Sequence, residues 1–308
     1  MPGPATPRPP RPRIACLGEA MVELSGLDWA GGTARLGVAG DAYNTAVYLA
    51  RLLPGAEVAF ATALGDDALS DAMAARMQAE GVSPRLLRRL PGRLPGLYAI
   101  ALDGGERSFH YWRRDSAARA MMDVLGPADL AGLDLLYLTG ISVAILPPEG
   151  RARLLACCEA LRAAGGRLAF DGNHRPRLWG AEDARAALAP FWARADIALP
   201  SREDEEALAP GEGLDGLVAR IGSPEVVVKD GARGPRVWSG GWVEAGPFPP
   251  APAVVDTTAA GDSFNAAYLA ARLRGLPPAG AARAGHALAA RVVGHPGAII
   301  PASAMSPP

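Results

Sequence analysis

Cysteine is scarce in this 308-residue chain, which contains only Cys16, Cys157 and Cys158. The last two are neighbours and cannot pair with each other easily, and no CxxC or mixed cysteine–histidine spacing occurs in the sequence. The pattern argues against a disulfide framework or a zinc site and is typical of reduced thiols inside a cell. We therefore expect a cytoplasmic protein.

Long apolar runs and an excess of charge are also missing. No run of about 18 apolar residues is present, so the sequence predicts no membrane span. Basic and acidic residues number 31 and 32, and the resulting net charge of −1 gives no reason to expect a nucleic-acid or membrane partner. No GxxxxGK[ST] stretch occurs, which disfavours a P-loop nucleotide hydrolase.

Apolar residues make up 49% of the chain, enough for the core of one large α/β domain or of two smaller ones. Residues 1–13 contain six prolines and three arginines, and we expect a disordered arm rather than a signal peptide. From Ile14 to the end, residues 14–308, strand-like runs alternate with helical patterns. This order predicts a parallel sheet covered by helices, with strands at 14–17, 58–64, 133–138, 167–170, 195–199 and 226–229.

Two segments interrupt the alternation. Residues 20–39 alternate loosely around a Gly31–Gly32 turn, and residues 97–102 and 106–113 are typical of a hairpin around residues 103–105. We expect both insertions, near 20–39 and 94–115, to form a small β-sheet lid. Its exposed edge strands favour pairing with a second copy, so we expect a homodimer through the lid.

Residues 256–264 carry the clearest chemical signal. The apolar run at 252–255 predicts a strand before them, and apolar residues at helical spacing predict a helix after them. With Thr258 as N-cap, the first turn would consist of three residues with almost no side chain, Ala259, Ala260 and Gly261. Their unpaired N–H groups, at the positive end of the helix dipole, can approach an anion closely.

Asp262 follows these small residues, although a carboxylate beside an anion site repels the anion. Its presence makes chemical sense if it takes a proton from a nucleophile that attacks a phosphoryl group held by the amides. An ordinary capped helix with an acidic first turn is the alternative.

The stretch DTTAAGD at residues 256–262 resembles the DTxGAGD signature of the ribokinase-like (PfkB-type) sugar kinases, with Ala259 in the place of the first glycine. The alanine slightly narrows the room at the phosphate. The resemblance extends from about Ile14 to Pro301 and implies a three-layer ribokinase-like α/β fold with a mainly parallel central sheet. It also implies phosphoryl transfer from ATP with Mg²⁺, with Asp262 as base and with amides at the phosphoryl group from Ala259, Ala260, Gly261 and Asp262.

Residues 39–44 open a predicted helix that ends before Pro54. They resemble the GGxxxN signature of the same family, which implies that Gly40, Asp41 and Asn44 hold the sugar hydroxyls. Helix capping by Asp41 and Asn44 is the alternative. Further upstream, Glu19 follows the first strand at a position typical of a ligand contact, or of a plain turn.

Residues 111–119, YWRRDSAAR, are similar to the YWRxxSAAR run of the 2-keto-3-deoxygluconate kinases within this family. The similarity implies that Tyr98, Tyr111 and Arg113 contact an acid sugar. Arg113 offers a forked donor that suits a carboxylate. An exposed hairpin with surface aromatic residues is the alternative.

The turn at 171–175 follows a predicted strand, at the end where open parallel sheets bind ligands. It resembles the family's D-x-N-x-R run, which implies that Asn173 and Arg175 lie at the nucleotide phosphates and the substrate, with Arg175 neutralising charge. We expect His174 to be a surface residue. The family usually has NxxE after the next strand, whereas this chain has Ser201 beside the nucleotide and Asp204, which would assist Mg²⁺ through water; an acidic first helical turn is the alternative.

The turn after residues 226–229 resembles the family's KxGxxG turn, which lies against the nucleotide. It implies nucleotide contacts from Lys229, Gly231 and Gly234, and the last helix would place His286 and Ala289 beside the adenine. Packing is the alternative for His286.

Taken together, these features predict an ATP- and Mg²⁺-dependent kinase that phosphorylates the primary hydroxyl of 2-keto-3-deoxygluconate to give the 6-phosphate. A kinase for another sugar, such as fructose or ribose, or for a nucleoside is the next alternative. A non-catalytic sugar-binding sensor is more distant, and a dinucleotide-binding reductase is more distant still.

Overall fold

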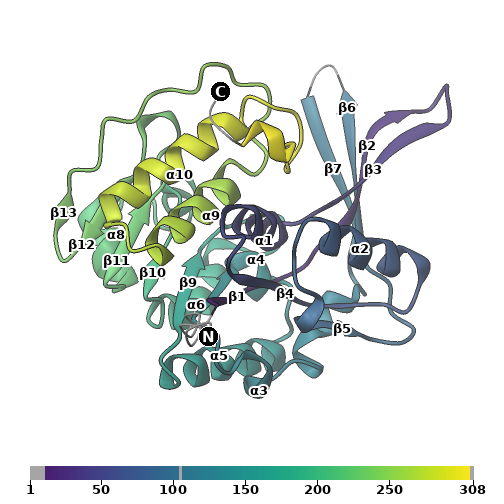
Figure 1. The fold of residues 1–308 in the computed structure, drawn as a ribbon, viewed down its shortest axis with the longest axis horizontal. Coiled ribbons are helices and arrows are strands. Elements are labelled where there is room, and N and C mark those ends of the chain that lie inside the picture. The colour runs from purple at the N-terminus through teal and green to yellow at the C-terminus, as the bar shows by residue number, and fades with distance from the viewer. Residues whose placement is uncertain (1–10, 104–105, 306–308) are drawn as a thin grey trace, which may run out of the picture.

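A computed structural model describes residues 11–103 and 106–305 (Figure 1). Its centre is a nine-stranded sheet in the order β13-β12-β11-β10-β9-β8-β1-β4-β5. All neighbouring strands from β11 to β5 are parallel, and only the edge pairings of β12 and β13 are antiparallel. The strands are β1 (Arg13–Leu17), β4 (Glu57–Leu64), β5 (Leu87–Arg89), β8 (Leu135–Thr139), β9 (Arg167–Asp171), β10 (Ile197–Ala198), β11 (Glu225–Val228), β12 (Arg236–Ser239) and β13 (Trp242–Val243).

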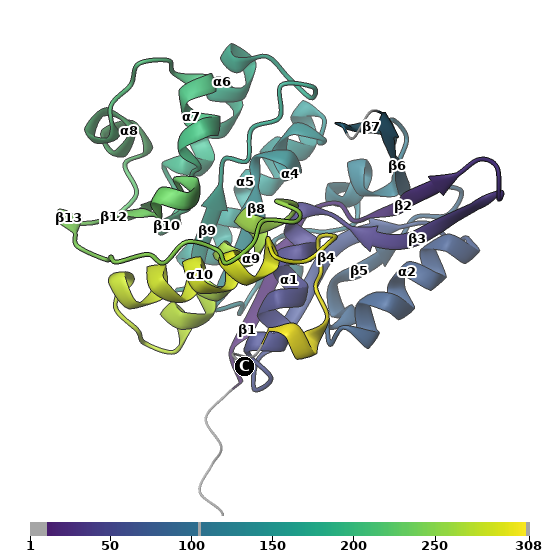
Figure 2. The ribbon, with the colours of Figure 1, turned by 90° about the horizontal axis from the view of Figure 1, so that it is seen from above.

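Helices cover both faces of this sheet (Figures 1 and 2). Successive side chains of a strand point to opposite faces, so Ile14 and Cys16 join one core and Ala15 and Leu17 the other. The first core includes α1 (Asp41–Leu52), α2 (Ala68–Ala79), α9 (Ala260–Leu273) and α10 (Pro278–Val292). The second includes α3 (Pro127–Leu130), α4 (Gly140–Ala144), α5 (Pro148–Ala163), α6 (Ala181–Trp192), α7 (Arg202–Leu208) and α8 (Leu214–Ile221). The predicted three-layer α/β architecture is confirmed.

A second, four-stranded sheet lies beside this body and is built from the two segments that interrupt the βα alternation (Figure 1). Its order is β3-β2-β6-β7, with β2 and β6 parallel and the outer pairs antiparallel. The strands are β2 (Met21–Asp28), β3 (Thr33–Ala39), β6 (Gly96–Asp103) and β7 (Glu106–Trp112). We call it the small sheet. Residues 104 and 105 of the expected hairpin turn lie outside the described residues.

Two expectations concern the N-terminal arm and the residues before the DTTAAGD stretch. Residues 1–10 of the expected arm lie outside the described residues, while Arg13 already pairs with Glu57 as the first residue of β1. Residues 252–255 form no strand, and Val254 and Val255 are exposed. Prolines at 249, 250 and 252 remove backbone donors that a strand would need.

Other features agree with the sequence. All three cysteines are buried and free, in keeping with a packing role. Residues 211–216 have the spacing GxGxxG and run into the first turn of α8, but they follow α7 and no strand, so they lack the setting of a dinucleotide-binding turn. No helix within 11–103 or 106–305 is long and apolar enough to cross a membrane.

Candidate active site

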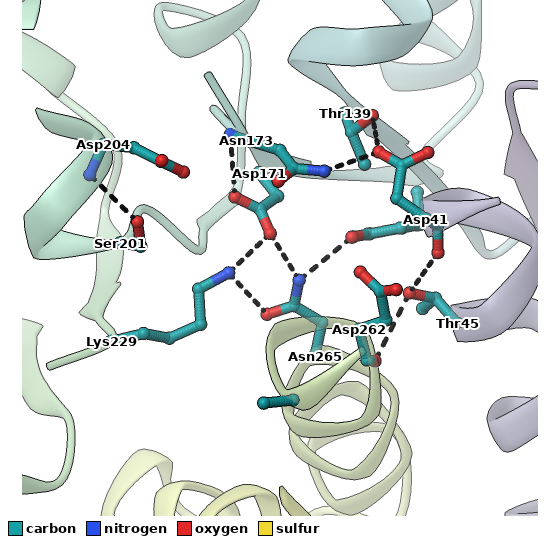
Figure 3. Close-up of polar contacts among 12 residues, drawn as sticks. Asp41, Thr45, Thr139, Asp171, Asn173, Ser201, Asp204, Lys229, Asp262 and Asn265 are labelled. Atoms are coloured by element: carbon teal, nitrogen blue, oxygen red, sulfur yellow. Dashed lines mark hydrogen bonds and ion pairs between the residues drawn. The ribbon is translucent and has the colours of Figure 1, made fainter. Parts of the chain in front are cut away.

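Asp262 lies in the first turn of α9, where this helix meets the start of α1 (Figure 3). Asn44 Nδ2 donates a hydrogen bond to Asp262 Oδ2 at 2.8 Å, and Thr45 Oγ1 donates to the Asp262 carbonyl oxygen at 3.3 Å. Two sequence signatures that are 218 residues apart thus meet at one carboxylate. Asn44, which we expected at the sugar, contacts the candidate base directly.

The turn before α9 differs from the predicted cap. The N-cap residue is Ala259, with φ 59° and ψ 17°, and the helix begins at Ala260. Thr258 does not cap the helix, because its hydroxyl donates to Asp256 Oδ1 at 2.6 Å. The left-handed conformation costs an alanine roughly 1–2 kcal/mol relative to glycine, which accounts for a glycine in the DTxGAGD signature at this position.

The backbone N–H groups at the start of α9 are only partly used within the protein. The Ala260 amide donates to the Thr257 carbonyl oxygen at 3.2 Å, whereas no described residue accepts a hydrogen bond from the Gly261 amide. A Cβ atom added to Gly261 would lie 3.7 Å from Lys229 Nζ, so an ammonium group stands close to this bare turn. A free N–H at a helix N-terminus together with an ammonium group suits a phosphate.

Lys229 is the chain's only lysine, and its ammonium is held in a buried network (Figure 3). Its Nζ forms an ion pair with Asp171 Oδ2 and donates to Asn265 Oδ1 at 3.2 Å. Asn265 Nδ2 in turn donates to Asp171 Oδ2 at 2.6 Å and to the Tyr137 hydroxyl at 2.9 Å. We singled out none of Asp171, Asn265 and Tyr137 from the sequence as site residues.

Asp41 and Asn173 are joined, although we assigned them to different ligands. Asn173 Nδ2 donates to Asp41 Oδ2 at 2.7 Å, and Thr139 Oγ1 donates to the same oxygen at 2.5 Å (Figure 3). Thr139 ends β8 and is the N-cap of α4, and no sequence motif pointed to it. The start of α1 is therefore connected to the carboxyl ends of β8 and β9, where ligands bind in such sheets.

Asp262 has no cationic partner of its own: within the described parts of the chain, no arginine or lysine forms an ion pair with it. Burial raises the pKa of its carboxyl group from 3.8 to about 8, and the negative charge of Asp41 adds to the rise. The hydrogen bond from Asn44 and the charge of Lys229 act in the opposite direction. Asp262 thus has a pKa near neutral pH, as a general base requires.

Arg175 is half exposed, and its Nη1 lies 3.7 Å from Asp204 Oδ1. The same nitrogen donates to the His174 carbonyl oxygen at 2.8 Å. Our expectation for His174 was wrong, because the residue is only 4% exposed and burial lowers the pKa of its imidazole. The turn folds inward at this point, with Asn173 buried and in a left-handed conformation at φ 37°.

Ser201 and Asp204 lie at the start of α7. Ser201 Oγ accepts a hydrogen bond from the Asp204 N–H at 3.2 Å, so this serine caps the helix, and burial raises the pKa of Asp204. No group of three or more histidine, cysteine, aspartate or glutamate residues in the described ranges is arranged to hold a metal ion. Mg²⁺ prefers to keep water and substrate phosphates as ligands, and an ATP-bound ion with Asp204 as a water-mediated neighbour fits this arrangement.

Further along, Gly231 and Gly234 both have positive φ, 53° and 79°, as a tight turn requires. A Cβ atom at Gly234 would collide with the Phe248 ring. His286 from α10 packs on that ring with centroids 5.1 Å apart, and its Nε2 contacts the Pro249 carbonyl oxygen at 2.7 Å. Gly234 and His286 therefore both pack against Phe248. Within the described parts of the chain, no hydrogen bond or ring contact joins Ala289, also in α10, to Phe248 or Pro249.

The small sheet contacts the turn before α9 through Ala259. Tyr98 belongs to a small apolar cluster against which Ala259 packs. Tyr98 and Tyr111 are cross-strand partners with ring centroids 5.7 Å apart, and the Tyr98 hydroxyl donates to Glu23. Arg113 does not stand free, because it forms an ion pair with buried Glu19.

Gly40 precedes α1 at a point of close approach. A Cβ atom there would collide with the Glu19 carbonyl oxygen, so only glycine fits. Its N–H lies 3.4 Å from Asn44 Oδ1. Glycine is therefore required here by the approach of Glu19, and a contact of the Gly40 backbone with the sugar stays a prediction.

Comparison with known proteins agrees with this geometry. The pfkB family carbohydrate kinase model matches residues 11–305. The chain belongs to the pfkB family of carbohydrate kinases.

Its relatives include the 2-dehydro-3-deoxygluconokinases of Dickeya dadantii (strain 3937) and Escherichia coli (strain K12). They are 45% and 42% identical over 95% of this chain and 98% of their own length. Among solved structures, the fructokinase with bound ATP from Xylella fastidiosa aligns with a TM-score of 0.83 at 24% identity, covering 95% of this chain and 96% of that one. The ribokinase-like fold predicted from the sequence is confirmed.

Proposed function

We propose that this carbohydrate kinase transfers the γ-phosphoryl group of ATP to the primary hydroxyl of 2-keto-3-deoxygluconate, also called 2-dehydro-3-deoxygluconate, to give its 6-phosphate. The single observation that carries the proposal is the 42–45% identity to curated 2-dehydro-3-deoxygluconokinases over nearly the whole chain. The site supports it, because an acidic side chain of raised pKa stands beside a free amide at a helix start.

Asp262 takes the proton from the attacking hydroxyl as the oxygen–phosphorus bond forms. Asn44 orients this carboxylate through the hydrogen bond to Oδ2. The Gly261 amide and the Lys229 ammonium stabilise the negative charge on the transferring phosphoryl group. Arg175, which is half exposed at the same end of the sheet, adds positive charge between donor and acceptor.

Mg²⁺ supplies charge neutralisation on the ATP phosphates when bound. Asp204 is the residue that we assign to its water shell. The Asp204 side chain is 19% exposed, whereas the neighbouring Arg175 side chain is 50% exposed, so the carboxylate is the more buried of the two groups. Nucleotide contacts are assigned to Asn173, Ser201, Lys229, Gly231, Gly234, Ala260, Gly261, His286 and Ala289.

The small sheet is the lid in this proposal. Tyr98, Tyr111 and Arg113 recognise the acid sugar, with Arg113 directed to its carboxylate. The Arg113 Nε atom is buried and has no hydrogen-bond acceptor among the described residues. Such an unmet donor favours a ligand that brings an acceptor.

Two further features belong to the proposal. The lid carries large exposed apolar side chains, Trp29 at 91%, Leu36 at 73% and Trp112 at 61%. Their exposure supports a homodimer through the lid, in which a second copy would bury them. ATP as phosphoryl donor and three free thiols support work in the cytoplasm.

A coupled assay of ADP release across a panel of sugars and sugar acids tests the proposed function. We expect the highest kcat/KM with 2-keto-3-deoxygluconate and Mg·ATP, and phosphorus NMR of the product showing a phosphate monoester on carbon 6. A higher kcat/KM with fructose, ribose or a nucleoside would contradict the acceptor assignment. Absence of ADP release with every acceptor would instead favour a sugar-binding sensor.

A further inference from the structure

The chain crosses between the body and the small sheet four times, and all four crossings meet at Glu19. The first is Glu19 itself, between β1 and β2. The second is Gly40, between β3 and α1, where a Cβ atom would collide with the Glu19 carbonyl oxygen. The third leads into β6 at Gly96, where a Cβ atom would lie 2.7 Å from Glu19 Oε1. The fourth, residues 113–116, leaves β7 and holds the side-chain partners of Glu19.

Glu19 is buried at the centre of these crossings, with 1% of its side chain exposed. Ser116 Oγ donates to its Oε1, and the Arg113 guanidinium forms an ion pair with its Oε2. The third and fourth crossings are also linked to each other, because the Ala117 amide donates to the Leu94 carbonyl oxygen at 2.9 Å. One residue therefore contacts every connection about which the small sheet can move relative to the body: its carboxylate meets the third and fourth crossings, and its backbone carbonyl oxygen meets the second.

A buried carboxylate is costly unless it is paired, and an apolar side chain would join the crossings at lower cost. What the carboxylate adds is a fixed position for Arg113. The guanidinium forms an ion pair with Glu19 and lies 5.9 Å from the Tyr111 ring, while its Nε and Nη2 are both buried without a hydrogen-bond acceptor among the described residues. Glu19 itself is too buried to reach a ligand, so any effect on recognition passes through Arg113.

We propose that Glu19 is a positioning residue that ties the four lid crossings together and holds Arg113 ready for the carboxylate of the acid substrate. The inference rests on the proposed function and deepens it. With Glu19 in place, the lid closes with the Arg113 guanidinium already oriented. Without it, the guanidinium is free to turn, and the sugar acid must order it on binding.

The experiment compares Glu19→Gln, Arg113→Met and the double variant with the wild type. KM is measured separately for 2-keto-3-deoxygluconate and for ATP, with a melting temperature for each protein. We expect Glu19→Gln to raise KM for the sugar acid about tenfold, with KM for ATP within about twofold of wild type. The double variant is expected to match Arg113→Met alone, because Glu19 acts through Arg113.

Glu225→Gln is the matched control. Glu225 is also a buried carboxylate held by an arginine, Arg272 at 2.8 Å, and by a hydroxyl, Tyr268 at 2.6 Å. A purely structural ion pair predicts that both glutamine variants lower the melting temperature and leave both KM values unchanged. That result for Glu19→Gln, or multiplicative losses in the double variant, would overturn the inference.

Two outcomes need separate treatment. If Glu19→Gln does not fold, Ser116→Ala removes only the contact to Oε1, and we expect it to raise KM for the sugar acid about threefold; an unchanged KM would count against the inference.

Failure of the proposed function is visible in the wild type alone, as a lack of turnover with 2-keto-3-deoxygluconate. Failure of the inference is visible only between variants of an enzyme that accepts this sugar acid.

Discussion

Asp171 and Asp262 lie in the same site, yet the protein surrounds their carboxylates differently. Asp171 is 3% exposed and receives an ion pair from Lys229 and hydrogen bonds from Asn265 and the Asn173 amide. Asp262 receives one side-chain hydrogen bond, from Asn44, and no ion pair within the described residues. The compensated carboxylate holds the site together, whereas the uncompensated one has its pKa raised and is available for proton transfer.

The largest expected effect is a loss of turnover in the Asp262 variant that the Asp171 variant does not isolate. Asp262→Asn removes the base while keeping the shape of the side chain, and we expect kcat to fall by roughly 10²–10⁴-fold. The melting temperature at neutral pH should remain at or above the wild-type value, because the wild-type carboxyl group must take up a proton or bury a charge on folding and the amide does neither. Near-normal turnover would show that Asp262 is not the base and that the two aspartates do not differ in this way.

Asp171→Asn should separate them by stability. Removing one partner of a buried ion pair leaves Lys229 uncompensated, and we expect a loss of about 3 kcal/mol in the free energy of unfolding. Urea denaturation of both asparagine variants checks this. Equal stability of the two variants would show that Lys229 does not depend on Asp171.

Arg113→Ala extends the comparison to a third carboxylate, Glu19, which would lose its cation. We expect kcat/KM for 2-keto-3-deoxygluconate to fall by roughly 10- to 100-fold, the range of a lost hydrogen bond to a charged group. A neutral sugar that is turned over at all should lose far less. Parallel kinetics on both acceptors are the measurement, and an equal loss on both would remove the carboxylate assignment.

The pH dependence of stability sharpens the contrast. The unfolded chain releases the Asp262 proton near its ordinary pKa of 3.8, whereas the folded protein keeps it up to about pH 8. The folded state therefore binds the extra proton between these values, and the contribution of Asp262 to stability falls as the pH rises through that window. The difference in unfolding free energy between wild type and Asp262→Asn should follow this course; a difference that does not change with pH would contradict the raised pKa.

The smallest effect concerns the turn beside Asp262. Ala259→Gly relieves the left-handed alanine but makes the unfolded chain more flexible, so we expect a gain in stability of up to roughly 1 kcal/mol. Turnover should stay within about twofold of wild type, because the amides keep their positions. Thermal denaturation measures the gain, and a clear loss of stability would show that the turn is not strained.

Much of this site could be predicted from the sequence because short motifs specify local backbone. The small residues before Asp262 predicted the bare helix start, and the βα alternation predicted the sheet. The cap was wrong because Thr258 bonds to Asp256 instead, which leaves Ala259 in the left-handed region. Side chains that can satisfy two neighbours do not reveal from the sequence which one they choose.

Contacts between residues far apart in the sequence could not be predicted from the sequence. Glu19 and Arg113 are 94 residues apart in sequence, Lys229 and Asp171 are 58 apart, and Thr139 and Asp41 are 98 apart. Hydrophobic periodicity shows which face of an element is buried, but not which polar groups meet where elements end. His174 was assigned to the surface for the same reason.

The pH profile of kcat/KM for 2-keto-3-deoxygluconate tests the central claim most directly, because it reports the ionisation of the free enzyme's essential base. We expect the rate constant to rise with pH and to level off above a midpoint near the Asp262 pKa of about 8. The residual activity of Asp262→Asn should lack this rise. A wild-type profile that is flat from about pH 5 to 9, or a rise that survives in Asp262→Asn, would contradict the assignment of Asp262 as the base.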